Sequence, residues 1–379
     1  MAKGKTKKKT VMKKKTYNAF KALFIIFTIL LVLIVGSWVT IHLIFNFEKD
    51  VRPSSGDIVD VIDKTNDEVK PEEQVKMIET LQKSDSLESA LRDWALNGDE
   101  NSLMRSREVI NILLVATDEK GSNTDVMMLL SVNQLKQQIT LTSFMRDEYT
   151  FINAGNAAYC TKLNAAYASG GMKTLVETVQ NNYKLRIDHY VLVGYDTFVK
   201  IVDILGGVKV PLQYYEAREM ERIAGGTEGS SVTEYGDAVK LTGYQSLLYC
   251  RIRKCDVDAD ISRTRRQRQF ITALIDECKG MDVSTAVTVV KTLLAYVKTD
   301  CTTTELMDLA TRAVVNGWSE YTIASQACPF AENRMDYQGK TWIWVVDYPA
   351  DAVQLHLSVY GKTNIILPEQ RTTALDLVK

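Results

Sequence analysis

The chain has 379 residues, with 46 lysines and arginines against 47 acidic residues, six cysteines and three histidines. So few histidines leave little material for a histidine-based metal site or catalytic triad, and no C-x-x-C spacing indicates a zinc site. The length is enough for one large domain, or one domain with an appended lobe, after an N-terminal segment.

The first 47 residues are typical of a membrane anchor. Residues 1–21 contain nine lysines and no acid, and residues 22–47 are 26 residues without a charged side chain. A helix of that length crosses a bilayer core of about 30 Å, and the lysines before it predict a cytoplasmic N-terminus. The alternative is a cleaved signal peptide, whose apolar region is usually only about 7–15 residues. We expect a single-pass protein of the cell membrane, with everything after residue 47 outside.

The charge of the external part argues against nucleic acid as a partner. Without the nine lysines of the tail, 37 basic residues face 47 acidic ones, a net charge of −10. A nucleic-acid-binding domain usually has a basic face, whereas this chain is acidic outside one group of arginines. That group indicates a local pocket for a small anion.

Residues 48–107 resemble a stalk. After Pro71, apolar residues recur at helical spacing and predict two short helices that pack on each other or on the main domain. They are Val75, Ile78 and Leu81 for the first helix, and Leu87, Leu91, Trp94 and Ala95 for the second.

Strands that alternate with helices follow the stalk, which is typical of an α/β fold with helices on both faces of a central sheet. We place the main domain at 108–280 and a C-terminal α/β extension at 281–379. In the main domain the patterns predict strands at 108–117, 125–132, 138–144, 188–195 and 208–212, and helices at 172–185 and 196–207. In the extension they predict helices at 284–298 and 302–317, strands at 321–327 and 341–347, and a helix after Pro349.

Six arginines lie close together between residues 251 and 268. If "LLYCRIRK" is a strand, Tyr249, Arg251 and Arg253 share one of its faces. "SRTRRQRQFITALIDECKG" predicts a helix with Ser262 as N-cap and Gly280 just after its end.

The positions of the arginines on that helix divide them into two sets. Arg263, Arg266 and Gln267 continue its apolar stripe and should point inward, whereas Arg265 and Arg268 should be solvated. Arginines are disfavoured at a helix N-terminus, because that end already carries a partial positive charge. A bound phosphate or pyrophosphate would remove the conflict. We therefore expect the arginines to repel one another without the anion, and folding to survive their replacement; a solvated charged face is the alternative.

Two carboxylates lie at neighbouring strand ends. Asp118 follows the first strand, Asp125 begins the next, and Gly121 turns between them. Such a pair can hold a hard cation such as Mg²⁺, although ordinary turn carboxylates are the alternative. Arg146 and Asp147 follow the third strand, where α/β sheets bind ligands.

The cysteines lie outside the predicted membrane span, where disulfides are permitted. Buried thiols are the alternative. The spacing of Cys301 and Cys328 around the predicted helix 302–317 suggests a local bridge. The full set is Cys160, Cys250, Cys255, Cys278, Cys301 and Cys328.

In their order along the chain, six segments resemble the LytR-CpsA-Psr family of membrane-anchored glycopolymer ligases. They are "NILLVATDEKGSNTDVMMLLSVN", "ITLTSFMRDEY", "KLNAAYASGG", "IDHYVLVGYDTFVKIVDILGGVKV", "LTGYQSLLYCRIRK" and "DADISRTRRQRQ". The resemblance implies the family's α-β-α sandwich. It also implies transfer of a glycopolymer, such as teichoic acid or capsule, from an undecaprenyl-pyrophosphate carrier to peptidoglycan.

The resemblance also implies roles for particular residues. Asp118 and Asp125 would bind Mg²⁺, with Mn²⁺ as an alternative. The pyrophosphate would contact Arg146, Arg251, Arg263 and Arg266, with Arg253, Asp260, Gln267 and Asp147 in supporting roles on the substrate. Asn123, Met145 and Cys250 depart from the family pattern, which usually has arginine, proline and a small residue there.

By analogy with the family, a muramic acid hydroxyl attacks the sugar-linked phosphorus and undecaprenyl phosphate leaves. Asp147 and Asp260 are candidates to accept the proton. The lipid tail needs an apolar pocket, for which the helices at 197–205 and 270–278 are candidates; plain core packing is the alternative. Two other functions use the same residues: a pyrophosphatase with water as acceptor, and a non-catalytic scaffold that binds polyprenyl phosphate.

Overall fold

The structure is a computed structural model, and it describes residues 85–378 apart from 119–120, 156, 228–230, 233, 257, 278–282, 284–295 and 338–342. The basic tail, the apolar segment 22–47 and the first stalk helix therefore lie outside the described residues. Within the described part of the chain, no helix combines the length and the apolar character needed to cross a membrane.

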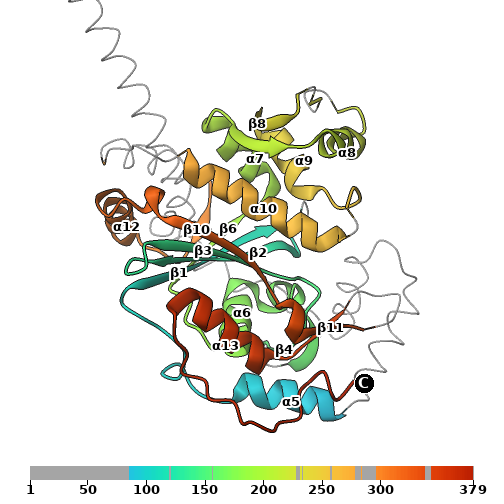
Figure 1. The fold of residues 1–379 in the computed structure, drawn as a ribbon, viewed down its shortest axis with the longest axis vertical. Helices are drawn as coiled ribbons and strands as arrows, with labels where there is room; N and C mark the ends of the chain where they lie inside the picture. The colour runs from blue at the N-terminus through green and yellow to red at the C-terminus, as the bar shows by residue number, and fades with distance from the viewer. Residues whose placement is uncertain are drawn as a thin grey trace, which may run out of the picture. The chain divides into compact units, whose positions relative to one another are not determined.

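The chain forms a mixed α/β fold around a six-stranded sheet with the strand order β10-β3-β2-β1-β6-β9 (Figure 1). The strands are β1 (Val109–Thr117), β2 (Thr124–Asn133), β3 (Gln138–Phe144), β6 (His189–Val193), β9 (Lys298–Thr299) and β10 (Thr322–Cys328). The predicted fold class, an α/β fold with a mixed central sheet, is confirmed. Helices on both faces of the sheet stay a prediction.

The described chain divides into two compact units. We call Gln137–Ile139 with Val191–Ser325 the arginine unit, and residues 85–136, Thr140–Tyr190 and 326–378 the aspartate unit. Each is described by itself.

The arginine unit contains most of the residues between 191 and 325. Its further elements are α7 (Tyr195–Ile204), β7 (Val208–Leu212), α8 (Tyr214–Ala224), β8 (Gly236–Leu241), α9 (Gly243–Arg251), α10 (Ala259–Asp276), α12 (Thr303–Val315) and a 3₁₀ turn at Trp318–Glu320. β7 pairs with β8 in an antiparallel ladder, and α9 packs on α7 and α10. Gly243 lets α9 approach α7, because a Cβ there would overlap the carbonyl of Val199.

Two predictions in this unit are wrong. The segment predicted as a strand, "LLYCRIRK", is mostly helix α9, because Thr242 and Gln245 form a reciprocal capping box that starts a helix. Tyr249, Arg251 and Arg253 therefore do not share one face of a strand. Helix α10 begins at Ala259 with Asp258 as N-cap, so Ser262 lies inside the helix and is buried.

The aspartate unit is built on the antiparallel pair β1–β2. Its further elements are α5 (Asp85–Leu96), β4 (Tyr149–Asn153), β5 (Ala158–Lys162), α6 (Ala165–Tyr183), β11 (Arg334–Asp336), β12 (Trp344–Val346), α13 (Tyr348–Tyr360) and a 3₁₀ turn at Ala331–Asn333. Helix α5 packs on α6 and β4, and its Leu87 and Leu91 are buried. The second predicted stalk helix therefore exists and packs on this unit.

The C-terminal predictions are largely confirmed. Thr302 and Glu305 form the predicted capping box of α12, and β10, β12 and α13 lie where the sequence places them. The predicted helix at 284–298 lies outside the described residues except at its end, where Lys298 begins β9.

The predicted disulfide is wrong, because Cys301 and Cys328 remain thiols. Both are buried, as is Cys160, whose pKa is raised by burial to about 12. These three cysteines fit the alternative that buried cysteine acts as a small hydrophobe.

Candidate functional site

The loop between β1 and β2 brings the two predicted aspartates to neighbouring strand ends. Asp118 follows β1, and Asp125 is the extra residue of a β-bulge, since Ala116 pairs with Val126 and Thr117 pairs with Thr124. A bulge turns one side chain away from the regular alternation of the strand, and bulges are common beside functional sites. We call residues 118–125 the carboxylate loop.

Neutral groups surround Asp118. Its carboxylate accepts hydrogen bonds from the Ser122 amide at 2.9 Å, the Ser122 hydroxyl at 3.3 Å and the Asn123 side-chain amide at 3.3 Å. Within the described part of the chain, Asp118 has no ion-pair partner. Its negative charge is therefore held in place but not neutralised.

Asn123 leaves a buried oxygen atom beside this carboxylate. Its side chain is 6% exposed, and its Oδ1 has no hydrogen-bond partner. A buried acceptor without a partner costs about 1–3 kcal/mol. Carboxylate and amide oxygens are ligands that Mg²⁺ and Mn²⁺ take, so Asp118, Asn123 and Asp125 fit such a cation.

Arg146 and Asp147 lie in the turn after β3 and join a chain of alternating charges. Arg146 Nη1 lies 3.2 Å from Asp125 Oδ1, and its Nε lies 3.5 Å from Asp147 Oδ2. Lys162, which is 2% exposed, places its Nζ 2.8 Å from Asp147 Oδ1. The aspartate unit therefore brings Asp125, Arg146 and Asp147 together, and adds Lys162, which sequence reasoning missed although it lies in "KLNAAYASGG".

In the arginine unit, Asp260 joins two of the predicted arginines. Its Oδ1 lies 3.2 Å from Arg253 Nη2 and 3.0 Å from Arg263 Nη2. Arg263 is buried, whereas the side chain of Arg253 is 42% exposed. These three predicted residues do lie together, with the carboxylate between two guanidinium groups.

Arg266 is fully buried, as predicted, but its partners are carboxylates of the protein. Its Nε lies 2.6 Å from Glu216 Oε1 on α8, and its Nη2 pairs with Asp256. Burial works to lower the pKa of Arg266, but hydrogen bonds to Glu216 and Asp256 outweigh it and raise the pKa above its ordinary value. The expected repulsion between unpaired arginines is therefore wrong, because carboxylates pair with Arg253, Arg263 and Arg266.

The remaining arginines and Gln267 have separate environments. Arg251 ends α9 with its guanidinium 5.1 Å from the centre of the Tyr195 ring, and Gln267 donates to the Cys250 carbonyl at 3.2 Å. The side chain of Arg265 is 49% exposed, as predicted. Arg268 is 7% exposed and donates to Ser325 Oγ at 2.7 Å, so its predicted solvation is wrong.

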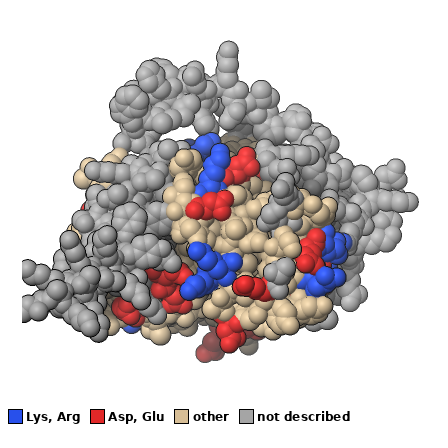
Figure 2. All heavy atoms as spheres, turned by 90° about the horizontal axis from the view of Figure 1, so that it is seen from above, with Lys and Arg blue, Asp and Glu red and all other residues tan. Residues whose placement is uncertain are grey.

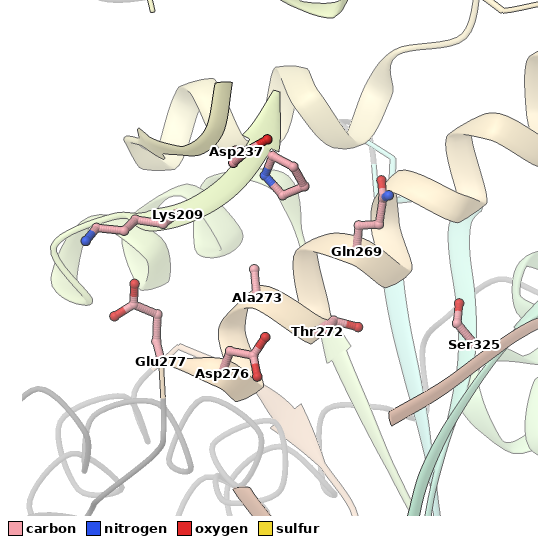
Figure 3. A pocket seen from close by; sticks show the side chains of 9 residues that line it. Lys209, Asp237, Gln269, Thr272, Ala273, Asp276, Glu277 and Ser325 are labelled. Atoms are coloured by element: carbon pink, nitrogen blue, oxygen red, sulfur yellow. The ribbon is translucent and has the colours of Figure 1, made fainter. Parts of the chain in front are cut away.

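A pocket of about 600 Å³ lies along the C-terminal half of α10 (Figure 3). It is lined by Lys209 and Pro211 of β7, Asp237 of β8, Gln269, Thr272, Ala273 and Asp276 of α10, and by Glu277 and Ser325. Its charged lining does not suit an apolar lipid tail. Phe198 and Phe270, on the two helices considered for that tail, stack on each other with ring centres 5.3 Å apart, which is core packing.

The exposed charges show no segregation by sign on the face drawn in Figure 2. Blue lysines and arginines and red acids alternate among the described residues there. The informative charges are therefore the buried groups described above.

The model of the LytR_cpsA_psr family matches residues 63–354. The chain belongs to the LytR-CpsA-Psr family. The match spans the carboxylate loop, the 145–148 turn and the arginine helix α10.

Curated relatives share about a third of the matched residues. A polyisoprenyl-teichoic acid–peptidoglycan teichoic acid transferase TagU of Bacillus mycoides is 33% identical over 224 residues, which are 58% of this chain and 69% of the relative. Biofilm regulatory protein A of Streptococcus mutans is 31% identical over 202 residues, 49% of this chain and 48% of the relative. The chain thus spans about half the length of the latter protein.

The fold is also that of solved family structures. The crystal structure of B. subtilis TagV aligns with a TM-score of 0.54 at 21% identity, over 68% of this chain and all of that chain. The likeness concerns the fold alone.

Proposed function

We propose that this protein transfers a glycopolymer from an undecaprenyl-pyrophosphate carrier to peptidoglycan, outside the membrane to which residues 22–47 anchor it. Membership of the family supports this reading, as does the printed name of the B. mycoides relative, a teichoic acid transferase acting between a polyisoprenyl carrier and peptidoglycan. The polymer carried by this chain is described only as a glycopolymer.

The carboxylate loop is the observation that carries the proposal. Asp118, Asp125 and Asn123 would hold one Mg²⁺ or Mn²⁺, which supplies positive charge to the phosphate oxygens when bound. Asp118 has no cationic partner among the described residues, and Asn123 Oδ1 has no donor. Both features are expected of a site completed by a cation.

The arginines act by binding and by position. Arg146, Arg251 and Arg263 would donate to pyrophosphate oxygens and stabilise the charge that grows on the leaving phosphate. Arg266 has two carboxylate partners in the protein, so we assign it the task of fixing the α10 end of the site.

The reaction forms one bond and breaks one. A muramic acid hydroxyl oxygen bonds to the sugar-linked phosphorus, the bond from that phosphorus to the bridging oxygen breaks, and undecaprenyl phosphate leaves with the electron pair. The hydroxyl proton must pass to a base. Asp147 pairs with Arg146 and Lys162, and Asp260 with Arg253 and Arg263, so both carboxylates suit a supporting role better.

Radiolabelled lipid-linked glycan, incubated with the full chain and peptidoglycan, tests the proposal. Label in the peptidoglycan is the expected result. Free sugar phosphate would instead support a pyrophosphatase, and tight binding without turnover would support a scaffold.

Protease added to intact protoplasts tests the anchored topology. Release of a fragment containing nearly all of residues 48–379 is expected. A protected body together with a cleaved tail would contradict it.

A further inference from the structure

The turn that carries Arg146 and Asp147 ends in a buried glutamate. Glu148 is 0% exposed, and its carboxyl group accepts three hydrogen bonds. The Met145 amide donates to Oε1 at 2.9 Å, and the hydroxyls of Tyr183 and Tyr348 donate to Oε2 at 2.8 and 3.2 Å. Glu148 thus closes the turn on itself and ties it to α6 and α13.

Glu148 has no cationic partner in the described residues, in contrast to Asp147 beside it. Burial raises the pKa of Glu148 well above its ordinary value; the Tyr183 hydroxyl lowers it, and the nearby Asp351 raises it further. A buried carboxyl group without a counter-ion prefers its neutral form. Its contacts are therefore hydrogen bonds of a kind that a glutamine side chain can also make.

The backbone of the turn is fixed mainly by the C-terminal part of the chain. The Trp344 amide of β12 donates to the Asp147 carbonyl at 2.9 Å, and the Met145 amide donates to the Cys328 carbonyl at 2.9 Å. The Glu148 carbonyl accepts from the Leu163 amide at 2.9 Å. β12, α13 and α6 therefore surround the turn within one unit, as β4, α6 and α13 do in Figure 1.

We propose that Glu148 is a positioning residue, which holds Arg146 and Asp147 in their working geometry through hydrogen bonds to the turn and to Tyr183 and Tyr348. The inference rests on the proposed function, because that function gives Arg146 its task. It also gives the C-terminal extension a role: Tyr348, the first residue of α13, supplies one of the hydroxyls. A direct role in proton transfer is excluded by the full burial of Glu148.

The arrangement predicts different results for two substitutions. Glu148→Gln keeps an acceptor for the Met145 amide and places an amide against the two hydroxyls, which can rotate to accept. Glu148→Ala removes all three contacts and frees the turn. Misplacing a catalytic group by about 1 Å can cost roughly a hundredfold in rate.

The test compares Glu148→Gln, Glu148→Ala and Tyr348→Phe with Leu91→Ala in the full chain. Leu91 is a matched control, because it is buried on α5 in the same unit and lies outside the turn. Three quantities are measured: kcat/KM for transfer, affinity for inorganic pyrophosphate, and hydrogen exchange of residues 144–149. The last two require no transfer, so they judge the inference even if the proposed function fails.

We expect Glu148→Ala to lower kcat/KM and pyrophosphate affinity at least about tenfold, and to speed exchange in residues 144–149. Glu148→Gln should stay within about threefold of the unmodified chain, and Tyr348→Phe should fall between them. Equal losses in Glu148→Gln and Glu148→Ala would overturn the inference. So would equal losses in Glu148→Ala and a Leu91→Ala chain of matched thermal stability.

Discussion

The carboxylate loop and the arginine helix α10 neutralise their charges in different ways. In α10 and the segment before it, Arg253, Arg263 and Arg266 have carboxylate partners within the protein. In the carboxylate loop, Asp118 is bound by amides and a hydroxyl, and Asn123 Oδ1 has no partner. The arginine unit is complete as it stands, whereas the loop lacks a positive charge.

This difference changes what each cluster says about function. A group of arginines suggests an anion site, but a buried arginine with two carboxylates can be there for the fold. Removing one partner of a buried ion pair costs much more than the pair contributes, because the other charge stays behind. Replacement of these side chains should therefore separate stability from activity.

The largest effect is expected at Arg266. Arg266→Ala leaves Glu216 and Asp256 without their cation and should lower the free energy of unfolding by about 3–5 kcal/mol. Denaturant unfolding measures this. Arg265→Ala is the control, because its exposed guanidinium lies 3.9 Å from Asp256, and it should change stability by less than about 0.5 kcal/mol. Equal stabilities of the two variants would show that Arg266 has no structural role.

The next largest effect is expected at Asp118. Asp118→Ala removes the carboxylate to which we assign the cation, and should lower transfer at least about a hundredfold. Stability should change little, because Asp118 carries no ion pair in the described residues. The transfer rate is measured against Mg²⁺ concentration. A variant that keeps the full response to Mg²⁺ would remove Asp118 from the cation site.

A smaller effect is expected at Arg263. Charge-assisted hydrogen bonds contribute about 1.5–3 kcal/mol, so Arg263→Ala should lower transfer roughly tenfold or more. Arg263→Lys should restore only part of the rate, because an ammonium group cannot make two parallel hydrogen bonds. Steady-state kinetics of both variants measure this. Full activity of Arg263→Ala would assign the arginine to its pair with Asp260 alone.

The smallest effect is expected at Asn123. Asn123→Leu keeps the size of the side chain and removes the unpartnered oxygen. The Mg²⁺ concentration for half-maximal transfer should rise about three- to tenfold, with the maximal rate nearly unchanged. An unchanged Mg²⁺ requirement would mean that Oδ1 binds water and no cation.

Local patterns predicted most of the fold. Continuous apolar runs located β1, β2 and β3, and helical spacing located α5, α6 and α13, because these signals lie within one element. The segment 247–253 was misread because alternation in "YCRIRK" suits a strand. The capping box at Thr242 and Gln245, a few residues earlier, decides for a helix.

The candidate site was predicted less completely, since its partners come from distant parts of the chain. The sequence located Asp118, Asp125, Arg146 and Arg263, but no local signal links Arg266 to Glu216, 50 residues away. Arg268 shows the same limit: it lies on the predicted polar side of the helix, yet donates to Ser325. The bulge at Asp125 and the burial of Glu148 likewise arise only when strands and helices pack.

Direct binding of Mn²⁺ tests the central claim, that the carboxylate loop is completed by a divalent cation. Mn²⁺ is titrated into the full chain in detergent, and the free ion is followed by electron paramagnetic resonance. We expect one bound Mn²⁺ that is lost in Asp118→Ala and retained in Arg263→Lys. Equal Mn²⁺ binding by the unmodified chain and Asp118→Ala would contradict the claim.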